Sequence, residues 1–164
     1  LAVVAALLIS LGTGTGGGPI YKNSFSDRFG GSREITLAGM EDDHYTITID
    51  DPGQDVLEVC PSDVVNLAPN TTETVAFTIG SVAGPLLRVH VTDTSDNPIA
   101  GASVLIEQGA FSATQETSLC GQTAFTSGLS TGTSTLTVSR TGYTTSVVTD
   151  VAITSSSTHT VQLN

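Results

Sequence analysis

The feature that most constrains the fold is a series of short segments in which apolar and polar residues alternate. Six such segments follow one another after residue 85, and glycine, asparagine, proline or serine falls between them. Alternation with a period of two is typical of strands with one buried face, and long helical patterns are missing after the first dozen residues. The class is therefore predicted to be all-β, with strands at 86–92, 102–107, 122–126, 133–139, 145–150 and 158–163.

A second group of short segments lies earlier in the chain. Strands are expected at 33–39, 44–50, 56–60, 63–67 and 73–79, separated by turn signals such as Asp51-Pro52-Gly53 and Pro69-Asn70. These segments make up a small β domain at 33–84, and 80–85 is the expected boundary. About fifty residues give little core of their own, so this domain is expected to share a face or to take a strand from elsewhere.

The C-terminal segments carry an ordered set of motifs that resembles carboxypeptidase regulatory-like domains. The motifs are Val89 to Asp93, Asp96-Asn97-Pro98-Ile99-Ala100-Gly101-Ala102, Gly121-Gln122-Thr123-Ala124-Phe125, Gly132 to Val138, Arg140-Thr141-Gly142-Tyr143 and Thr160 to Leu163. The resemblance implies a seven-stranded, transthyretin-like Greek-key sandwich over residues 85–164. That family's name comes from enzymes whose catalytic domain this chain does not contain, so the resemblance implies no peptidase activity.

The chain starts with eleven mostly apolar residues, LAVVAALLISL, followed by a Gly-rich run and a polar linker at 19–32. Eleven residues are too few for a membrane-spanning helix, which needs about 20. We expect residues 1–18 to be an assembly arm with a hinge, and the arm to be helical. A donor strand inserted into a neighbouring copy and an arm that packs on its own domain are the alternatives. The expected assembly contacts are Leu1, Val3, Val4, Leu7, Leu8, Ile9 and Leu11, and the expected hinge is Gly12, Gly14, Gly16, Gly17 and Gly18.

The apolar run from Ala2 to Gly12 resembles the later part of the N-terminal helix of type IV pilins and archaeal pilins. In those proteins a β-rich headpiece follows the helix. The processing-site residues of that family, and the early acidic residue of the bacterial members, do not occur here, so the subfamily stays open.

Two cysteines, Cys60 and Cys120, are expected to form a disulfide, which indicates an oxidising compartment. Cys120 stands before Gly121, where regulatory-like domains usually carry a polar turn residue, and a bond to Cys60 explains the change. Two separate thiols are the alternative. Asn70-Thr71-Thr72 is an N-glycosylation sequon, so Asn70 is the expected glycosylation site.

The charge and the motifs exclude several function classes. A formal net charge of −11 repels nucleic acids and anionic membranes. We expect no enzyme activity, no cofactor and no metal site, because His44, His90 and His159 lack metal-ligand spacing and no G-x-S-x-G motif occurs. The acidic groups at 41–43, 50–55 and 93–96 can in principle hold calcium, but solvated turn carboxylates are the preferred interpretation.

These observations predict a pilin-like structural subunit of an extracellular, cell-surface filament. Copies of the chain would bind one another through the arm, with the β headpiece exposed and available for adhesion, and a membrane would be involved only before assembly. The alternatives are a secreted or cell-surface module that binds glycans or proteins, and an accessory domain of a larger secreted enzyme.

Overall fold

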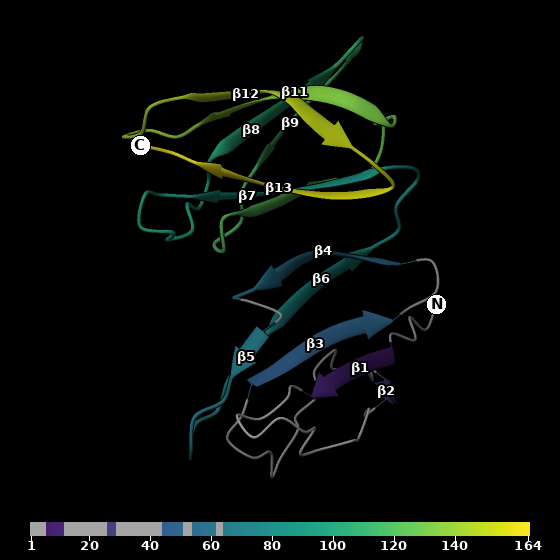
Figure 1. Cartoon of the computed structure of the whole chain (residues 1–164), viewed down its shortest axis with the longest axis vertical. Helices are drawn as coiled ribbons and strands as arrows, with labels where there is room; N and C mark the ends of the chain where they lie inside the picture. Colours follow the sequence, from purple (N-terminus) through teal and green to yellow (C-terminus); the bar gives the residue numbers. More distant parts are fainter. Residues whose placement is uncertain (1–5, 12–25, 29–43, 51–53, 62–63) are drawn as a thin grey trace. The chain divides into compact units, whose positions relative to one another are not determined.

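The computed structural model describes residues 6–11, 26–28, 44–50, 54–61 and 64–164, and all of its regular elements are β-strands (Figure 1). The predicted all-β class is therefore confirmed. The chain divides into two compact units, residues 1–77 and 78–164, and the division falls within strand β6. Each unit is described separately.

The first unit contains a four-stranded antiparallel sheet with the order β2-β1-β3-β5. Strand β6 continues into the second unit and pairs with β4 in a two-stranded sheet. Tyr45 on β3 is buried. The strands are β1 (Ala6–Leu11), β2 (Ser26–Arg28), β3 (His44–Asp50), β4 (Asp55–Cys60), β5 (Val64–Asn66) and β6 (Ala76–Gly80).

The apolar arm is a strand in this structure, and the expected helix is wrong for residues 6–11. β1 pairs antiparallel with β3 over six residue pairs, from Ala6↔Asp50 to Leu11↔Tyr45, and with β2 over three. A mostly apolar run suits a buried strand as well as a helix, so local pattern alone does not decide between them. Pairing with β3 satisfies the backbone of β1, as a strand interior requires.

The second unit is a sandwich of two sheets, seen as two layers in Figure 1. One sheet has the order β10-β7-β13, and the other has the order β12-β11-β8-β9. β13 runs parallel to β7, and the remaining neighbours are antiparallel. The strands are β7 (Leu86–Thr92), β8 (Ser103–Gln108), β9 (Phe111–Glu116), β10 (Gln122–Phe125), β11 (Gly132–Ser139), β12 (Ser146–Ile153) and β13 (Ser156–Gln162).

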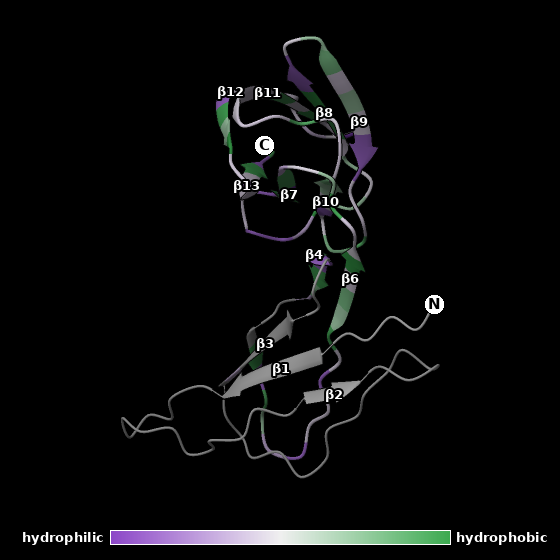
Figure 2. Ribbon diagram, turned by 90° about the vertical axis from the view of Figure 1, so that its right-hand side faces the viewer, coloured by the Kyte–Doolittle hydropathy of each residue, from purple (hydrophilic) through white to green (hydrophobic). Residues whose placement is uncertain are grey.

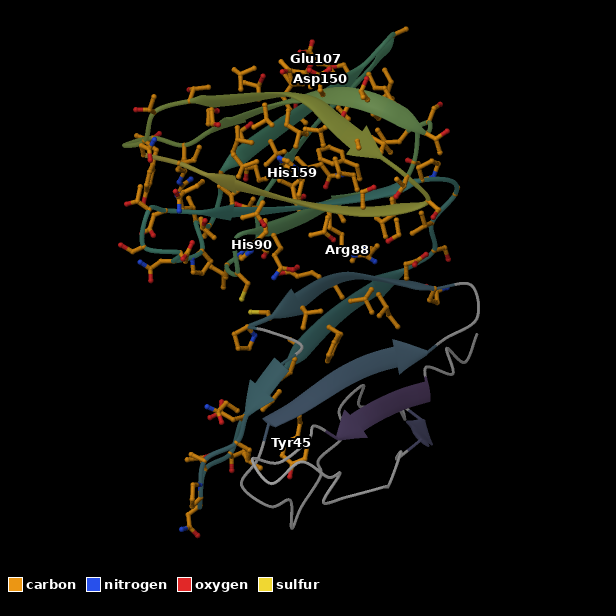
Figure 3. The ribbon with its side chains drawn as sticks, in the orientation of Figure 1. Tyr45, Arg88, His90, Glu107, Asp150 and His159 are labelled. Atoms are coloured by element: carbon orange, nitrogen blue, oxygen red, sulfur yellow. The ribbon has the colours of Figure 1, made fainter. Side chains whose placement is uncertain are left out.

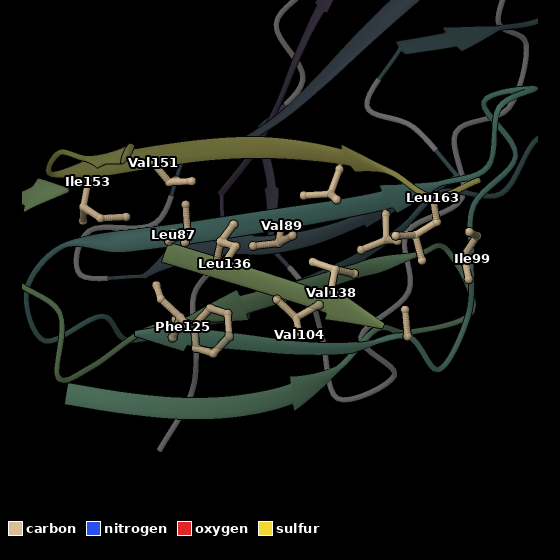
Figure 4. Close-up of a cluster of buried hydrophobic side chains, with 14 of the residues drawn as sticks. Leu87, Val89, Ile99, Val104, Phe125, Leu136, Val138, Val151, Ile153 and Leu163 are labelled. Atoms are coloured by element: carbon tan, nitrogen blue, oxygen red, sulfur yellow. The ribbon is translucent and has the colours of Figure 1, made fainter. Parts of the chain in front are cut away.

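The core of the sandwich consists of alternate residues from the two sheets (Figure 4). β7 contributes Leu87, Val89 and Val91, and each has an exposed fraction of 1% or less. Val104 and Ile106 on β8 are fully buried, as are Leu136 and Val138 on β11. The predicted seven-stranded sandwich is thus confirmed, and it rests on aliphatic side chains apart from Phe125.

Candidate functional site

A shallow hollow of about 300 Å³ lies at one end of the sandwich. It is formed where β8 ends, β9 and β11 begin, and the loop after β10 passes between them. A hollow of this size lies at the lower limit for small-molecule sites. Its lining residues are Gln108, Gly109, Phe111, Gly128, Ser130, Thr131, Gly132 and Thr133.

The side-chain amide of Gln108 fixes the loop that forms one wall of the hollow. Its Nε2 donates to the Ser130 carbonyl at 2.8 Å, and its Oε1 accepts from the Ser130 backbone N–H at 2.8 Å. This reciprocal pair holds two segments together that are 22 residues apart in the sequence. The wall is therefore set before any ligand arrives, which lowers the entropic cost of binding.

The floor of the hollow depends on a glycine beneath an aromatic ring. A Cβ added at Gly128 would overlap the ring of Phe111, and Gly128 has a φ of +81°. Glycine alone suits both the close approach and the backbone conformation. Phe111 is half-buried, with its inner part packed against the core, so part of the ring faces the hollow.

The lining is uncharged. It offers part of an aromatic ring, the hydroxyls of Ser130, Thr131 and Thr133, and exposed backbone. A ring combined with hydroxyl and backbone groups suits a neutral, polar ligand, because hydrogen bonds orient the ligand while the ring covers its apolar part. No lining residue titrates near neutral pH.

Asp93, at the opposite end of the sandwich, stabilises the loop that follows β7. The Asp93 Oδ1 accepts from the backbone N–H groups of Ser95 at 2.8 Å and Asn97 at 2.9 Å, and Oδ2 accepts from Asn97 Nδ2 at 3.0 Å. These bonds, led by the one from the Asn97 side chain, lower the pKa of the Asp93 carboxyl. Both carboxylate oxygens of Asp93 thus accept hydrogen bonds from donors of the same loop.

The turn at 118–121 carries the second cysteine. Ser118 N donates to the Gln122 carbonyl at 2.8 Å, Gly121 N donates to the Ser118 carbonyl at 3.0 Å, and Val91 N donates to the Gly121 carbonyl at 2.8 Å. Gly121 has a φ of +68°, and a Cβ there would lie 2.5 Å from the Val91 oxygen. The turn therefore requires glycine at 121, which gives a physical reason for the Gly-Gln-Thr-Ala-Phe motif.

The residues of the C-terminal motifs lie in one seven-stranded sandwich. Residues 87–164 match the family model of the carboxypeptidase regulatory-like domain. The resemblance seen in the sequence is confirmed, and we call this part of the chain the regulatory-like domain. A comparison with curated proteins gives no match.

Solved structures give weaker similarities. Two type II cohesin–X–dockerin complexes from Acetivibrio cellulolyticus, each an interface mutant, contain a chain with 17% identity and a TM-score of 0.39. The alignment covers 49% of this chain and 57% of that chain. The Bacillus anthracis TIE protein has 10% identity and a TM-score of 0.40, over 99% of this chain and 34% of its own length. This chain thus spans little more than half, or about a third, of the structures it matches.

Both cysteines are disulfide-bonded, and the pairing of Cys60 with Cys120 stays a prediction. Structural disulfides persist in oxidising compartments. The disulfide and the regulatory-like domain together indicate an extracellular or cell-surface binding or structural module.

The predicted assembly residues divide between described and undescribed parts of the chain. The structure places Leu7, Leu8, Ile9 and Leu11 on β1, in the sheet of the first unit. Leu1, Val3 and Val4 lie outside the described residues, as do all five hinge glycines and the strand expected at 33–39. The hinge therefore stays a prediction.

Asn70 lies in an exposed turn with a φ of +57°, and Thr71 and Thr72 are also exposed. Thr71 Oγ1 donates to the Ala68 carbonyl at 2.7 Å and closes this turn. The sequon is therefore accessible, and glycosylation at Asn70 stays a prediction.

Four titratable side chains of the sandwich lie on different sheets. Arg88 and His90 stand on β7, whereas Glu107 on β8 and Asp150 on β12 belong to the other sheet of the sandwich (Figure 3). Within the described ranges, no three His, Cys, Asp or Glu side chains form a group that can hold a metal ion. The same part of the chain has no helix long and apolar enough to cross a membrane.

Sequence reasoning missed β9 and with it the hollow. The signal was the Gln108-Gly109-Ala110-Phe111 sequence, because Gly followed by one residue is typical of a two-residue hairpin turn. Gly109 indeed has a φ of +59°, and Gln108 pairs with Phe111. No local sequence pattern indicates the hydrogen bonds between the Gln108 side chain and the Ser130 backbone.

Proposed function

We propose that the chain is a structural subunit of an extracellular filament, in which copies bind one another through β1 and present the regulatory-like domain. The observation that carries the proposal is the position of β1 between β2 and β3. β1 thus occupies an interior position of this sheet, with a strand on each side. The proposed role is non-catalytic and requires no cofactor.

An interior strand can be supplied by another copy. The exchanged strand makes the same ladder with β3 that β1 makes within its own chain, so exchange costs little in contacts. The predicted hinge at Gly12 to Gly18 follows β1 directly in the sequence, where an exchanged strand needs chain freedom. Each copy then gives one strand and accepts one, a head-to-tail contact that extends into an open filament.

This proposal takes the donor strand from the alternatives left open by the sequence and sets the assembly helix aside. The apolar character of β1 supports it, because an apolar strand that leaves its own sheet gains most from entering an equivalent site.

Peptide complementation tests the proposal. A variant lacking residues 1–11 is expected to remain folded in the regulatory-like domain, to form no filaments by negative-stain microscopy, and to bind a synthetic peptide of residues 1–11. A peptide of the same composition in scrambled order is the control. Filaments that persist without residues 1–11, or equal binding of both peptides, would refute the role of β1.

The hollow supports a second candidate function, in which the regulatory-like domain binds a neutral glycan or a protein segment. The braced Gln108–Ser130 wall and the ring of Phe111 favour it. Chemical-shift titration with neutral oligosaccharides is expected to move the amides of 128–133. Phe111→Leu should reduce the response and Tyr143→Leu should not, because Tyr143 lies at the opposite end of the sandwich.

A further inference from the structure

The outer edge of β9 differs from the three other sheet edges of the regulatory-like domain. β12 pairs with β11 through a register shift between Ser134 and Leu136, and it carries Asp150 at a φ of +58°. A bulge and a charge of this kind protect an edge against further pairing. The edge strand β10 is short, with four residues, and short edges resist further pairing. Just beyond the third edge strand, β13, the Asn164 carbonyl already accepts a hydrogen bond from the Thr144 N–H.

β9 has none of these protections. It pairs with β8 through six consecutive residues without a register shift, and it lies at the edge of its sheet (Figure 2). Its sequence, FSATQE, contains no proline or lysine, and its one charged residue is Glu116 at the end. A regular edge of this length can accept another strand.

The hydrogen bonds beyond the end of β9 show which backbone groups face outward. Thr117 N donates to the Ala102 carbonyl at 2.9 Å, which extends the β8–β9 register by one bonded pair. Bonded and non-bonded pairs alternate in an antiparallel ladder. Residues 111, 113 and 115 therefore bond to β8, and the N–H and C=O groups of Ser112, Thr114 and Glu116 point away from it. The side chains of these three residues are exposed.

We infer that β9 pairs antiparallel with β9 of a second copy, on a two-fold axis at Thr114. In this register Thr114 faces its own counterpart and Ser112 faces Glu116 of the other copy. Opposed residues put their side chains on the same face, so the core faces of the two sheets stay aligned. The pairing joins two four-stranded sheets into one continuous sheet.

The charge pattern supports a second copy as the occupant. A two-fold pairing sets each Glu116 opposite a Ser112, and the two carboxylates lie about 13 Å apart along the strand. Like charges directly opposite each other would destabilise the pair, and this register avoids them. The threonine at the centre faces another threonine, which is a favourable cross-strand pair. The interface is thus self-complementary, as a two-fold contact requires.

This contact does not involve β1, so it is independent of the proposed filament contact. Cysteine cross-linking in the full chain tests the register. Thr114→Cys places two thiols at a bonded pair, where the Cα atoms are about 5.5 Å apart, within disulfide range. Ser112→Cys is the matched control, because its counterpart is about 13 Å away. Under mild oxidation, non-reducing gels should show a covalent dimer for the first variant alone. Equal cross-linking of both variants, or none, would overturn the inference.

A second pair of variants tests the backbone contact. Thr114→Pro removes an outward N–H without touching the β8 ladder, and it should weaken dimerisation by about tenfold or more. Thr114→Ala keeps the N–H and loses only the threonine side-chain pair, so it should weaken dimerisation by no more than about fivefold. Analytical ultracentrifugation measures both, with far-UV circular dichroism to check the fold. If the proline variant unfolds, the cysteine pair still decides the question. A native chain that stays monomeric at every concentration would contradict the inference.

Discussion

Two buried threonines in the regulatory-like domain should respond in opposite directions to the same substitution. Thr117 and Thr92 have exposed fractions of 6% and 3%. Thr117 Oγ1 accepts from Ala102 N at 2.8 Å and donates to the Ile99 carbonyl at 2.6 Å. Among the described residues, Thr92 Oγ1 is the buried side-chain atom without a hydrogen-bond partner. Valine has the same shape in both places and removes the hydroxyl.

The magnitudes follow from what each hydroxyl leaves behind. Thr117→Val leaves the buried N–H of Ala102 without an acceptor and removes the hydrogen bond to the Ile99 carbonyl. The free energy of unfolding should therefore fall by about 2–3 kcal/mol. Thr92→Val removes a desolvated hydroxyl and leaves no partner behind, so the free energy of unfolding should rise by about 1 kcal/mol. The two variants should therefore differ by about 3–4 kcal/mol.

Urea unfolding of the oxidised full chain, followed by far-UV circular dichroism, measures both changes. Hydrogen exchange at the Ala102 amide assigns the effect to the regulatory-like domain, because this amide loses its acceptor only in Thr117→Val. Shifts of the same sign in both variants would refute the reasoning, and so would a Thr117→Val variant as stable as the native chain.

Three further changes test other parts of the domain. Gly121→Ala should lower the free energy of unfolding by about 3 kcal/mol or more, because the added Cβ meets the Val91 oxygen. Gly109 has a similar φ but no atom within 4 Å of an added Cβ, so Gly109→Ala should lower it by only about 1–2 kcal/mol. Urea unfolding measures both changes. Asp93→Ala should destabilise the chain near neutral pH, and the difference should vanish as pH falls through the lowered pKa of Asp93, because a depressed pKa stabilises the fold only while the carboxyl is ionised; a pH-independent difference would contradict this. Reducing the disulfide should lower the free energy of unfolding by roughly 3–4 kcal/mol for a loop of about 60 residues, and alkylation should label two thiols only after reduction.

The strands that the sequence predicted best are those with strict alternation. β7 and β3 occupy their predicted ranges, 86–92 and 44–50, because every second residue is apolar and the flanking turns are clear. β9 was missed because Phe111 and Ala113 are its only apolar residues, too few to establish a period.

The remaining differences come from contacts between distant segments. β1 became a strand because β3 offers it a ladder, and the sequence of residues 6–11 fits both conformations. The wall of the hollow depends on Gln108 and Ser130, which the fold brings together over 22 residues. The hydroxyl of Thr92 without a hydrogen-bond partner has no signal in the sequence, because Thr123 on β10 and Ser134 on β11 are also buried and their hydroxyls do have partners.

The two proposed self-contacts have different symmetry, and this makes them separable. Pairing of β9 with β9 uses the same surface twice, so on its own it ends at a dimer. Exchange of β1 uses two different surfaces, so on its own it continues into an open chain. Removing residues 1–11 should therefore leave dimers, and Thr114→Pro should leave filaments one subunit wide. A chain with both changes should be monomeric. Each contact thus determines the product that remains when the other is lost. Sedimentation together with negative-stain microscopy distinguishes the native assembly, the dimer, the filament one subunit wide and the monomer.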